Sequence, residues 1–186
     1  MQEFDIIIVG GGPAGYNCAE YAAHHGKSVM LVEKKALGGT CLNVGCIPTK
    51  TFLYASKLYH YADGAGEPYG VTAGGEPSVD QAAVVEKKDE VVKTLVQGVA
   101  SALRRAKVRV VNGTASVGRR DGGLVVTVDG EDYGAKDLIL ATGSSPAVPP
   151  IEGAREGLAD GTVMTSDAIL DMTEIPAKLL IVGGGV

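Results

Sequence analysis

The stretch IIIVGGGPAG, residues Ile6–Gly15, joins a run of apolar residues to a cluster of glycines. Phe4–Val9 is largely apolar and predicts a buried strand, and Pro13–His25 then predicts a helix with apolar residues on one side. Gly26 is the expected C-terminal cap of this helix, and Ser28–Val32 predicts a second buried strand. A strand, a helix and a strand in this order form a βαβ unit, which predicts a parallel sheet.

The glycines of this stretch have the spacing G-x-G-x-x-G, at Gly10, Gly12 and Gly15. Between a strand and a helix, such glycines let the backbone turn tightly and approach a pyrophosphate at the helix N-terminus. Glu33 ends the second strand, where a carboxylate can accept hydrogen bonds from ribose hydroxyls. The alternative is that the glycines only form a tight turn and that Glu33 is a solvated strand end. The strand–turn–helix context favours dinucleotide binding.

The rest of the chain is divided by its periodicity and its turn residues. Helices are predicted at Cys46–Tyr61 and Val79–Ala106, with Gly98 as a candidate interruption and an exposed loop at 63–78. Further expected features are strands at Val108–Val111, Thr114–Val117, Leu124–Val128, Leu138–Leu140 and Lys178–Val182, a hairpin turn at Asp129-Gly130 and a helix start at Thr165–Asp167. Together these features predict an α/β, Rossmann-like fold with a parallel sheet, helices on both faces and a small antiparallel β-meander.

Composition narrows the class of protein. The chain has 186 residues, a net charge of −5 and no long basic run, which argues against a nucleic-acid partner. We expect no signal peptide and no membrane span, because the N-terminus is acidic and the apolar runs are short. The chain has three cysteines and no export signal, which predicts a cytoplasmic protein in which a disulfide turns over instead of being structural.

A second motif, GGTCLNVGCIPTK, spans Gly38–Lys50 and contains Cys41 and Cys46. Two buried thiols would leave the surrounding Gly, Asn and Pro unexplained, and a metal site lacks a second pair of ligands, so no metal is expected. Gly45 lets the loop bring two sulfurs together, and Cys46 is expected at a helix N-terminus, where the helix dipole favours a thiolate. Lys50, one turn further on, adds positive charge. This pattern is typical of dithiol–disulfide exchange.

GGTCLNVGCIPTK, the N-terminal GGGPAG and the strand-end Glu33 together resemble the pyridine nucleotide–disulfide oxidoreductases over the whole chain. Within that family CIPTK is most similar to the members that oxidise dihydrolipoamide. Glutathione-type and mercuric-type reductases share the cysteine pair and stay an alternative, as does a flavin-binding piece without turnover. The resemblance implies FAD here and NAD in a longer parent. It also implies a homodimeric parent and, as its partner, the lipoyl group of a 2-oxoacid dehydrogenase or glycine cleavage complex.

The resemblance also implies roles for individual residues. Cys46 is expected to be the thiolate beside the flavin, Cys41 the exposed thiol that exchanges with substrate, and Lys50 a charge that tunes the flavin ring. Glu33 is expected to hold the adenosine ribose, and Thr40 to lie under the pyrophosphate. The expected FAD contacts are Gly10, Gly12, Pro13, Ala14, Gly15, Glu33, Lys34, Gly39, Thr40, Cys46, Lys50, Ala115, Thr142, Gly143 and Ser144.

The C-terminal residues repeat the opening motif, because IVGGG occurs at Ile8–Gly12 and again at Ile181–Gly185. The resemblance implies that a nicotinamide-binding domain starts at the second copy. We therefore expect an FAD-binding domain with the redox disulfide at 1–150 and a connecting segment at 151–177. The first strand and partial glycine motif of the second domain are expected at 178–186.

The remaining candidate side chains are interpreted as structural. The acid–base histidine of the family has no counterpart among His24, His25 and His60, so the chain alone is expected to lack turnover. Cys18 lies on the apolar side of its helix and is predicted to pack in the core. Tyr54, Tyr59 and Tyr61 fit either a core or an interface. Surfaces that face missing domains are expected to be exposed and apolar.

Overall fold

The computed structural model describes residues 1–72 and 74–184. Its strands are β1 (Gln2–Val9), β2 (Val29–Glu33), β3 (Arg109–Asn112), β4 (Ala115–Arg120), β5 (Gly123–Val128) and β6 (Glu131–Leu140). Its α-helices are α1 (Pro13–His24), α2 (Gly39–Asn43), α3 (Cys46–His60), α4 (Gln81–Arg105) and α5 (Ala154–Asp160). Short helical turns are η1 (Tyr61–Ala65), η2 (Glu67–Tyr69) and η3 (Ala168–Asp171).

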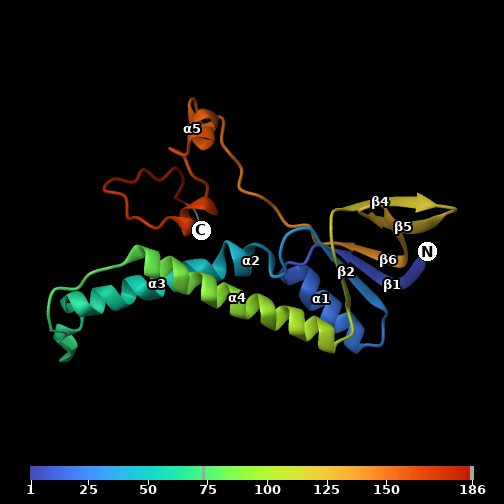
Figure 1. The fold of residues 1–186 in the computed structure, drawn as a ribbon, viewed down its shortest axis with the longest axis horizontal. Helices are drawn as coiled ribbons and strands as arrows, with labels where there is room; N and C mark the ends of the chain where they lie inside the picture. Colours follow the sequence, from blue (N-terminus) through green and yellow to red (C-terminus); the bar gives the residue numbers. More distant parts are fainter. Residues whose placement is uncertain (73, 185–186) are drawn as a thin grey trace.

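The strands form a sheet in the order β3-β2-β1-β6-β5-β4. β1 pairs in parallel with β2 and β6, and β2 pairs in parallel with β3, whereas β4, β5 and β6 form an antiparallel meander. In this register Val9 lies opposite both Val32 and Leu140, and Glu33 lies opposite Asn112. The carboxyl ends of the four parallel strands therefore meet at one edge of the sheet (Figure 1).

Apolar side chains alternate between the two faces of the sheet, and each face has its own core. On one face Ile8 and Leu31 pack with Ala19 of α1 and Leu103 of α4. On the other face, the buried cluster joins β1 and β2 to the meander and consists of Phe4, Ile7, Met30, Val32, Val126, Val128, Tyr133 and Ala135. The predicted α/β fold with a mostly parallel sheet is confirmed. Helices are expected on both faces, but among the described residues no helix contributes to this second cluster. The apolar side chains of the meander cover β1 and β2 on this face.

The helices α3 and α4 form a long pair that extends past the sheet (Figure 1). α4 runs without a break through Gly98, at which an added Cβ would meet nothing within 4 Å. An exposed glycine in a helix costs only about 1 kcal/mol, so the rest of the helix outweighs it. Asp80 caps α4 by accepting a hydrogen bond from the Ala83 amide at 3.1 Å. The predicted interruption of this helix is therefore wrong.

The C-terminal part of the chain, from residue 141 onward, leaves the sheet as an irregular segment that carries α5 and η3. The predicted strand at Lys178–Val182 is wrong, because these residues pair with no strand in the described part of the chain. Leu180 is 88% exposed. Gly185 and Val186, at the end of the predicted second glycine motif, lie outside the described residues, as does Ala73 in the predicted loop. In the described part, no helix is long and apolar enough to cross a bilayer.

Candidate active site

The expected contacts converge on the carboxyl edge of the parallel strands. The glycine loop follows β1, Lys34 follows β2, and the segment from Ala141 follows β6. The Ala141 amide donates to the Val9 carbonyl oxygen at 2.8 Å, which holds this segment beside the glycine loop. Ligands of open α/β sheets bind outside the carboxyl ends of the strands, so the site lies where this fold favours it.

Each glycine of the loop has a separate steric reason. Gly10 has φ +112°, and a Cβ there would collide with the carbonyl oxygen of Ala141. A Cβ at Gly15 would collide with the carbonyl oxygen of Gly10, so α1 could not lie close to β1. At Gly12 the nearest atom to an added Cβ is the Gly39 Cα at 3.6 Å. Gly10 and Gly15 are therefore required by the protein itself, whereas Gly12 leaves room above the loop for a ligand.

The carboxylate of Glu33 is fixed under the glycine loop by two backbone amides. Its Oε2 accepts a hydrogen bond from the Gly11 amide and its Oε1 from the Lys35 amide, both at 2.7 Å. Each oxygen keeps further lone pairs for an outside donor, such as a hydroxyl. The Glu33 carbonyl accepts from the Gly113 amide at 2.9 Å, which brings the segment before Ala115 to the same edge. Glu33 and the segment before Ala115, two of the expected FAD contacts, thus lie near one another.

The cysteine motif forms two helices joined by a sharp turn. The first, α2, was expected to be a loop, but Asn43 holds it by donating to the carbonyl oxygens of Leu37 and Gly39 at 3.0 and 2.9 Å. Cys46 is the first residue of α3, as predicted. A Cβ at Gly45 would lie 2.9 Å from the Thr40 carbonyl oxygen, so only glycine allows this turn. Sequence reasoning missed Asn43, because its two hydrogen bonds to earlier carbonyl oxygens have no signal in the composition or spacing of the motif.

The turn between α2 and α3 brings the two cysteines together. The neighbouring Cys46 side chain and, after it, burial raise the pKa of the Cys41 thiol, so the two side chains lie close enough to influence one another. Lys50 acts in the opposite direction, which means that its charge reaches the pair. Both cysteines are free thiols. Cys41 is half-buried and Cys46 is exposed, so the expectation that Cys41 is the exposed member is wrong for this form of the protein.

The cysteine motif is fastened to the glycine loop through backbone atoms. The Gly38 amide donates to the Gly11 carbonyl oxygen at 2.8 Å. A Cβ at Gly39 would lie 2.6 Å from the Gly12 Cα, so the two backbones touch. A ligand that lies over Gly12 therefore also lies beside α2 and the cysteines.

Most of the remaining predicted contacts are exposed. Exposed residues among them are Pro13, Ala14, Lys34, Thr40, Lys50, Thr142, Gly143 and Ser144. Gly143 has φ +69°, which glycine adopts readily where the chain turns away from β6. None of these eight described residues belongs to either buried cluster, and their contact with FAD stays a prediction.

The side chains interpreted as structural have mixed outcomes. Cys18 packs against the core of the α1 face, as predicted. His24 lies 3.8 Å from Glu20 on the same helix, and His25 lies 2.8 Å from the Tyr21 carbonyl oxygen, so both have local partners. Tyr54, Tyr59 and Tyr61 are 63%, 38% and 47% exposed, which excludes the core. Leu53 and Leu58 on α3 are exposed as well, so α3 has an exposed apolar surface, and its packing against a further domain stays a prediction.

Comparison with known proteins identifies the family. The family model described as pyridine nucleotide-disulphide oxidoreductase matches residues 4–186. The chain belongs to this family.

Similar curated members are a dihydrolipoyl dehydrogenase of Acholeplasma laidlawii, 45% identical, and one of Mycoplasma pneumoniae, 41% identical. Both alignments cover 100% of this chain, but 54% and 40% of the relatives. The chain thus spans about half or less of the length of these oxidoreductases. A similar solved structure is the Cu(II) complex of the flavoprotein disulfide reductase RclA of Escherichia coli, with a TM-score of 0.71 and 26% identity over 95% of this chain and 36% of that one.

Membership of this oxidoreductase family implies FAD as the cofactor, with NAD in the longer enzymes. The residues present fit FAD. The backbone at Gly12 is open for a pyrophosphate at the N-terminus of α1, and a side chain there would fill that space. The Glu33 carboxylate is held in place with acceptor capacity to spare. Beside them, the pair Cys41 and Cys46 can hold or release two electrons as a dithiol or a disulfide.

Proposed function

We propose that this chain is the flavin and disulfide half of an enzyme that oxidises dihydrolipoamide with NAD⁺. The observation that carries the proposal is the backbone junction between the glycine loop and the helix turn of Cys41 and Cys46. The names of the curated relatives support dihydrolipoamide as the substrate. We also propose a division into an FAD domain at 1–150, a connecting segment at 151–177 and the start of a second domain at 178–186.

The cysteines would carry out the exchange with substrate. In the oxidised protein, a substrate thiolate attacks the Cys41 sulfur, the Cys41–Cys46 bond breaks, and Cys46 leaves as a thiolate. The second substrate thiol then attacks the mixed disulfide and releases Cys41 with its proton. The substrate has lost two electrons to the cysteine pair, and the raised pKa of Cys41 supports its role as the member that keeps the proton.

Other residues would hold the cofactor and stabilise charge. Cys46 is the first residue of α3, where the helix dipole stabilises a thiolate, and Lys50 adds positive charge one turn later. Glu33 would accept hydrogen bonds from the ribose, and Gly12 and Thr40 would lie at the pyrophosphate. Bound FAD would supply a two-electron acceptor, so that Cys41 and Cys46 could return to the disulfide, with NAD⁺ as the final acceptor in the longer parent.

The parent protein is proposed to be a homodimer in the cytoplasm. Its partner would be the lipoyl group of a 2-oxoacid dehydrogenase or glycine cleavage complex. These 186 residues alone would lack turnover, since none of their histidines matches the acid–base position of the family. Steady-state NADH–lipoamide activity of this chain would contradict that statement.

A second candidate function is reduction of another disulfide or of mercury. The likeness to a solved flavoprotein disulfide reductase favours it, because that protein shares 26% identity over 95% of this chain. The two candidates differ only in the substrate that meets Cys41. Activity of the longer parent with lipoamide, compared with glutathione disulfide and Hg(II), would distinguish them.

The test of the flavin and disulfide function is a visible absorption spectrum of the chain loaded with FAD, taken before and after addition of one equivalent of dithiol. We expect bound flavin, and a long-wavelength band on reduction that disappears in Cys46→Ser. Cys18→Ser is the matched control, because Cys18 packs against the core of the α1 face. A chain that takes up no FAD, or a band that survives Cys46→Ser, would refute the proposal.

A further inference from the structure

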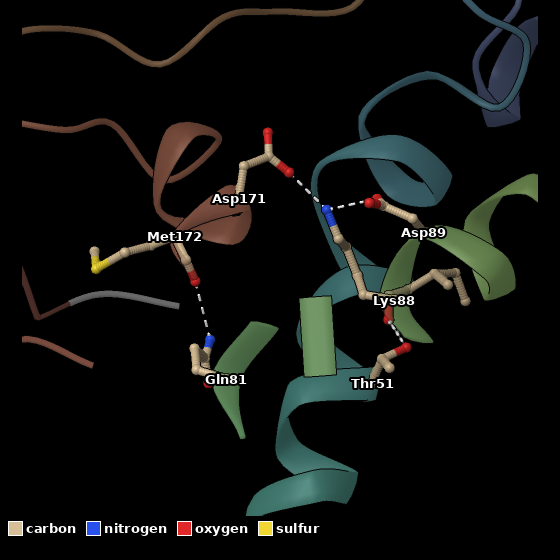
Figure 2. A network of polar contacts seen from close by, with 7 residues as sticks. Thr51, Gln81, Lys88, Asp89, Asp171 and Met172 are labelled. Atoms are coloured by element: carbon tan, nitrogen blue, oxygen red, sulfur yellow. Dashed lines mark hydrogen bonds and ion pairs between the residues drawn. The ribbon is translucent and has the colours of Figure 1, made fainter. Parts of the chain in front are cut away.

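A buried lysine connects α4 to the C-terminal segment. The side chain of Lys88 is only 4% exposed, yet its Nζ donates to Oδ1 of Asp171 in η3 at 2.6 Å. The same Nζ lies 2.8 Å from Oδ1 of Asp89, its neighbour on α4. Figure 2 shows the Lys88 side chain extending toward η3, with the two carboxylates on either side of its ammonium group.

Few other polar contacts hold η3 in this place. The side-chain amide of Gln81 donates to the Met172 carbonyl oxygen at 3.2 Å (Figure 2), and Leu170 is buried. The hydrogen bonds within η3 are long, at 3.3 Å for the amides of Ile169, Leu170 and Met172. A turn of this kind has little stability of its own, so its position depends on contacts to α4.

The two carboxylates around Lys88 belong to different parts of the molecule. Asp89 stays with Lys88 whether or not η3 is docked, because both are on α4. Asp171 is 75% exposed and returns to water at little cost when η3 leaves. Burial acts to lower the pKa of Lys88, but Asp171 and Asp89 outweigh it and hold the pKa above its usual value, so the amine stays charged. Undocking therefore leaves no buried charge without a partner, the situation that is most costly in proteins.

We propose that Lys88 is a reversible latch, in which Asp171 closes the connecting segment onto α4 and Asp89 stabilises the open state. The states with η3 docked on α4 and undocked from it then differ by a small free energy. In the docked state, Lys88 determines where the chain beyond residue 172 begins. The latch involves none of the residues assigned to the flavin or the cysteine pair, so it stands or falls independently of the proposed function.

Hydrogen exchange of the η3 amides, measured on the full 186-residue chain, tests the latch. Asp171→Asn removes the closing partner, and we expect about tenfold faster exchange at 169–172, since a hydrogen bond between charged groups is lost. Lys88→Met should also speed exchange at 169–172. Because methionine keeps an apolar chain of similar length, this variant tests the ammonium group separately from the packing of the aliphatic part of Lys88. Lys87→Met is the matched control, because Lys87 is exposed and pairs with Glu90 on its own helix at 2.8 Å.

Asp89→Asn separates a latch from an ordinary ion pair. Removing Asp89 takes away the partner of the open state and a negative charge near Asp171, so exchange at 169–172 should become several-fold slower. Unchanged or faster exchange in Asp89→Asn would overturn the shared-lysine mechanism. Wild-type exchange in Asp171→Asn would overturn the latch itself, and that variant cannot fail merely by unfolding, because its side chain is exposed.

Discussion

The contrast between Gly12 and Gly15 allows ligand binding to be separated from folding. In Gly15→Ala the new methyl collides with the Gly10 carbonyl oxygen and lies 3.0 Å from the Gly10 carbonyl carbon, both backbone atoms that cannot move aside. Overpacking of this kind costs about 1–3 kcal/mol. In Gly12→Ala the methyl meets only the Gly39 Cα, at the ordinary distance of 3.6 Å, and the backbone has φ −75°. Stability should then change by about 0.5 kcal/mol or less.

FAD binding should show the opposite order of effects. The methyl of Gly12→Ala occupies the space that a pyrophosphate needs above α1, so we expect affinity to fall about 100-fold or more, equivalent to about 3 kcal/mol. Urea unfolding of the cofactor-free chain gives the stability, and quenching of flavin fluorescence gives the affinity. The reasoning is refuted if Gly12→Ala binds FAD like the wild type, or if Gly15→Ala unfolds at the wild-type urea concentration.

Three further predictions concern charged and titrating groups. In Cys46→Ala the pKa of Cys41 should fall toward its ordinary value, so the pH midpoint of its alkylation by iodoacetamide should move down; an unchanged midpoint would contradict the influence of Cys46 on Cys41. Hydrogen bonds from Lys136 and Ser28 hold the pKa of Asp5 well below its usual 3.8, so this group stabilises the fold above that pH and loses its effect in acid. Asp5→Asn should therefore unfold at lower urea at pH 7, with the gap narrowing as the pH falls below 3.8; a constant gap would exclude the carboxylate. Glu33→Gln places a side-chain NH₂ group against a backbone N–H. The free energy of unfolding in urea should therefore fall by about 1–3 kcal/mol, and the affinity for FAD should also fall. Wild-type values of both would contradict a place for Glu33 in the site.

The part of the fold that could be predicted is the part in which local sequence and tertiary contacts agree. β1, α1 and β2 follow directly from the periodicity of residues 4–33, and Gly10 and Gly15 mark the turn that their packing requires. Cys46 at the start of α3 also follows from local rules, because Gly45 and Pro48 flank the helix start.

The errors arise where a specific side-chain contact or a partner element decides the structure. Lys178–Val182 has the composition of a strand, but a strand needs a neighbour, and the described chain provides none there. α2 was missed because Asn43 stabilises it through hydrogen bonds to Leu37 and Gly39, which composition does not reveal. Lys88 looks like any helical lysine in the sequence, and only the approach of Asp171, 83 residues away, makes it unusual.

The junction between Gly38–Gly39 and Gly11–Gly12 has a consequence for how such a protein can be altered. It is made of main-chain atoms alone, so exchanging side chains around the site leaves the spacing between the glycine loop and the cysteines unchanged. Charged side chains near the cysteines, such as the exposed Lys50 on α3, can then be exchanged without changing this spacing. The distance between the glycine loop and the cysteines is set by the backbone, so changing it requires a different loop conformation.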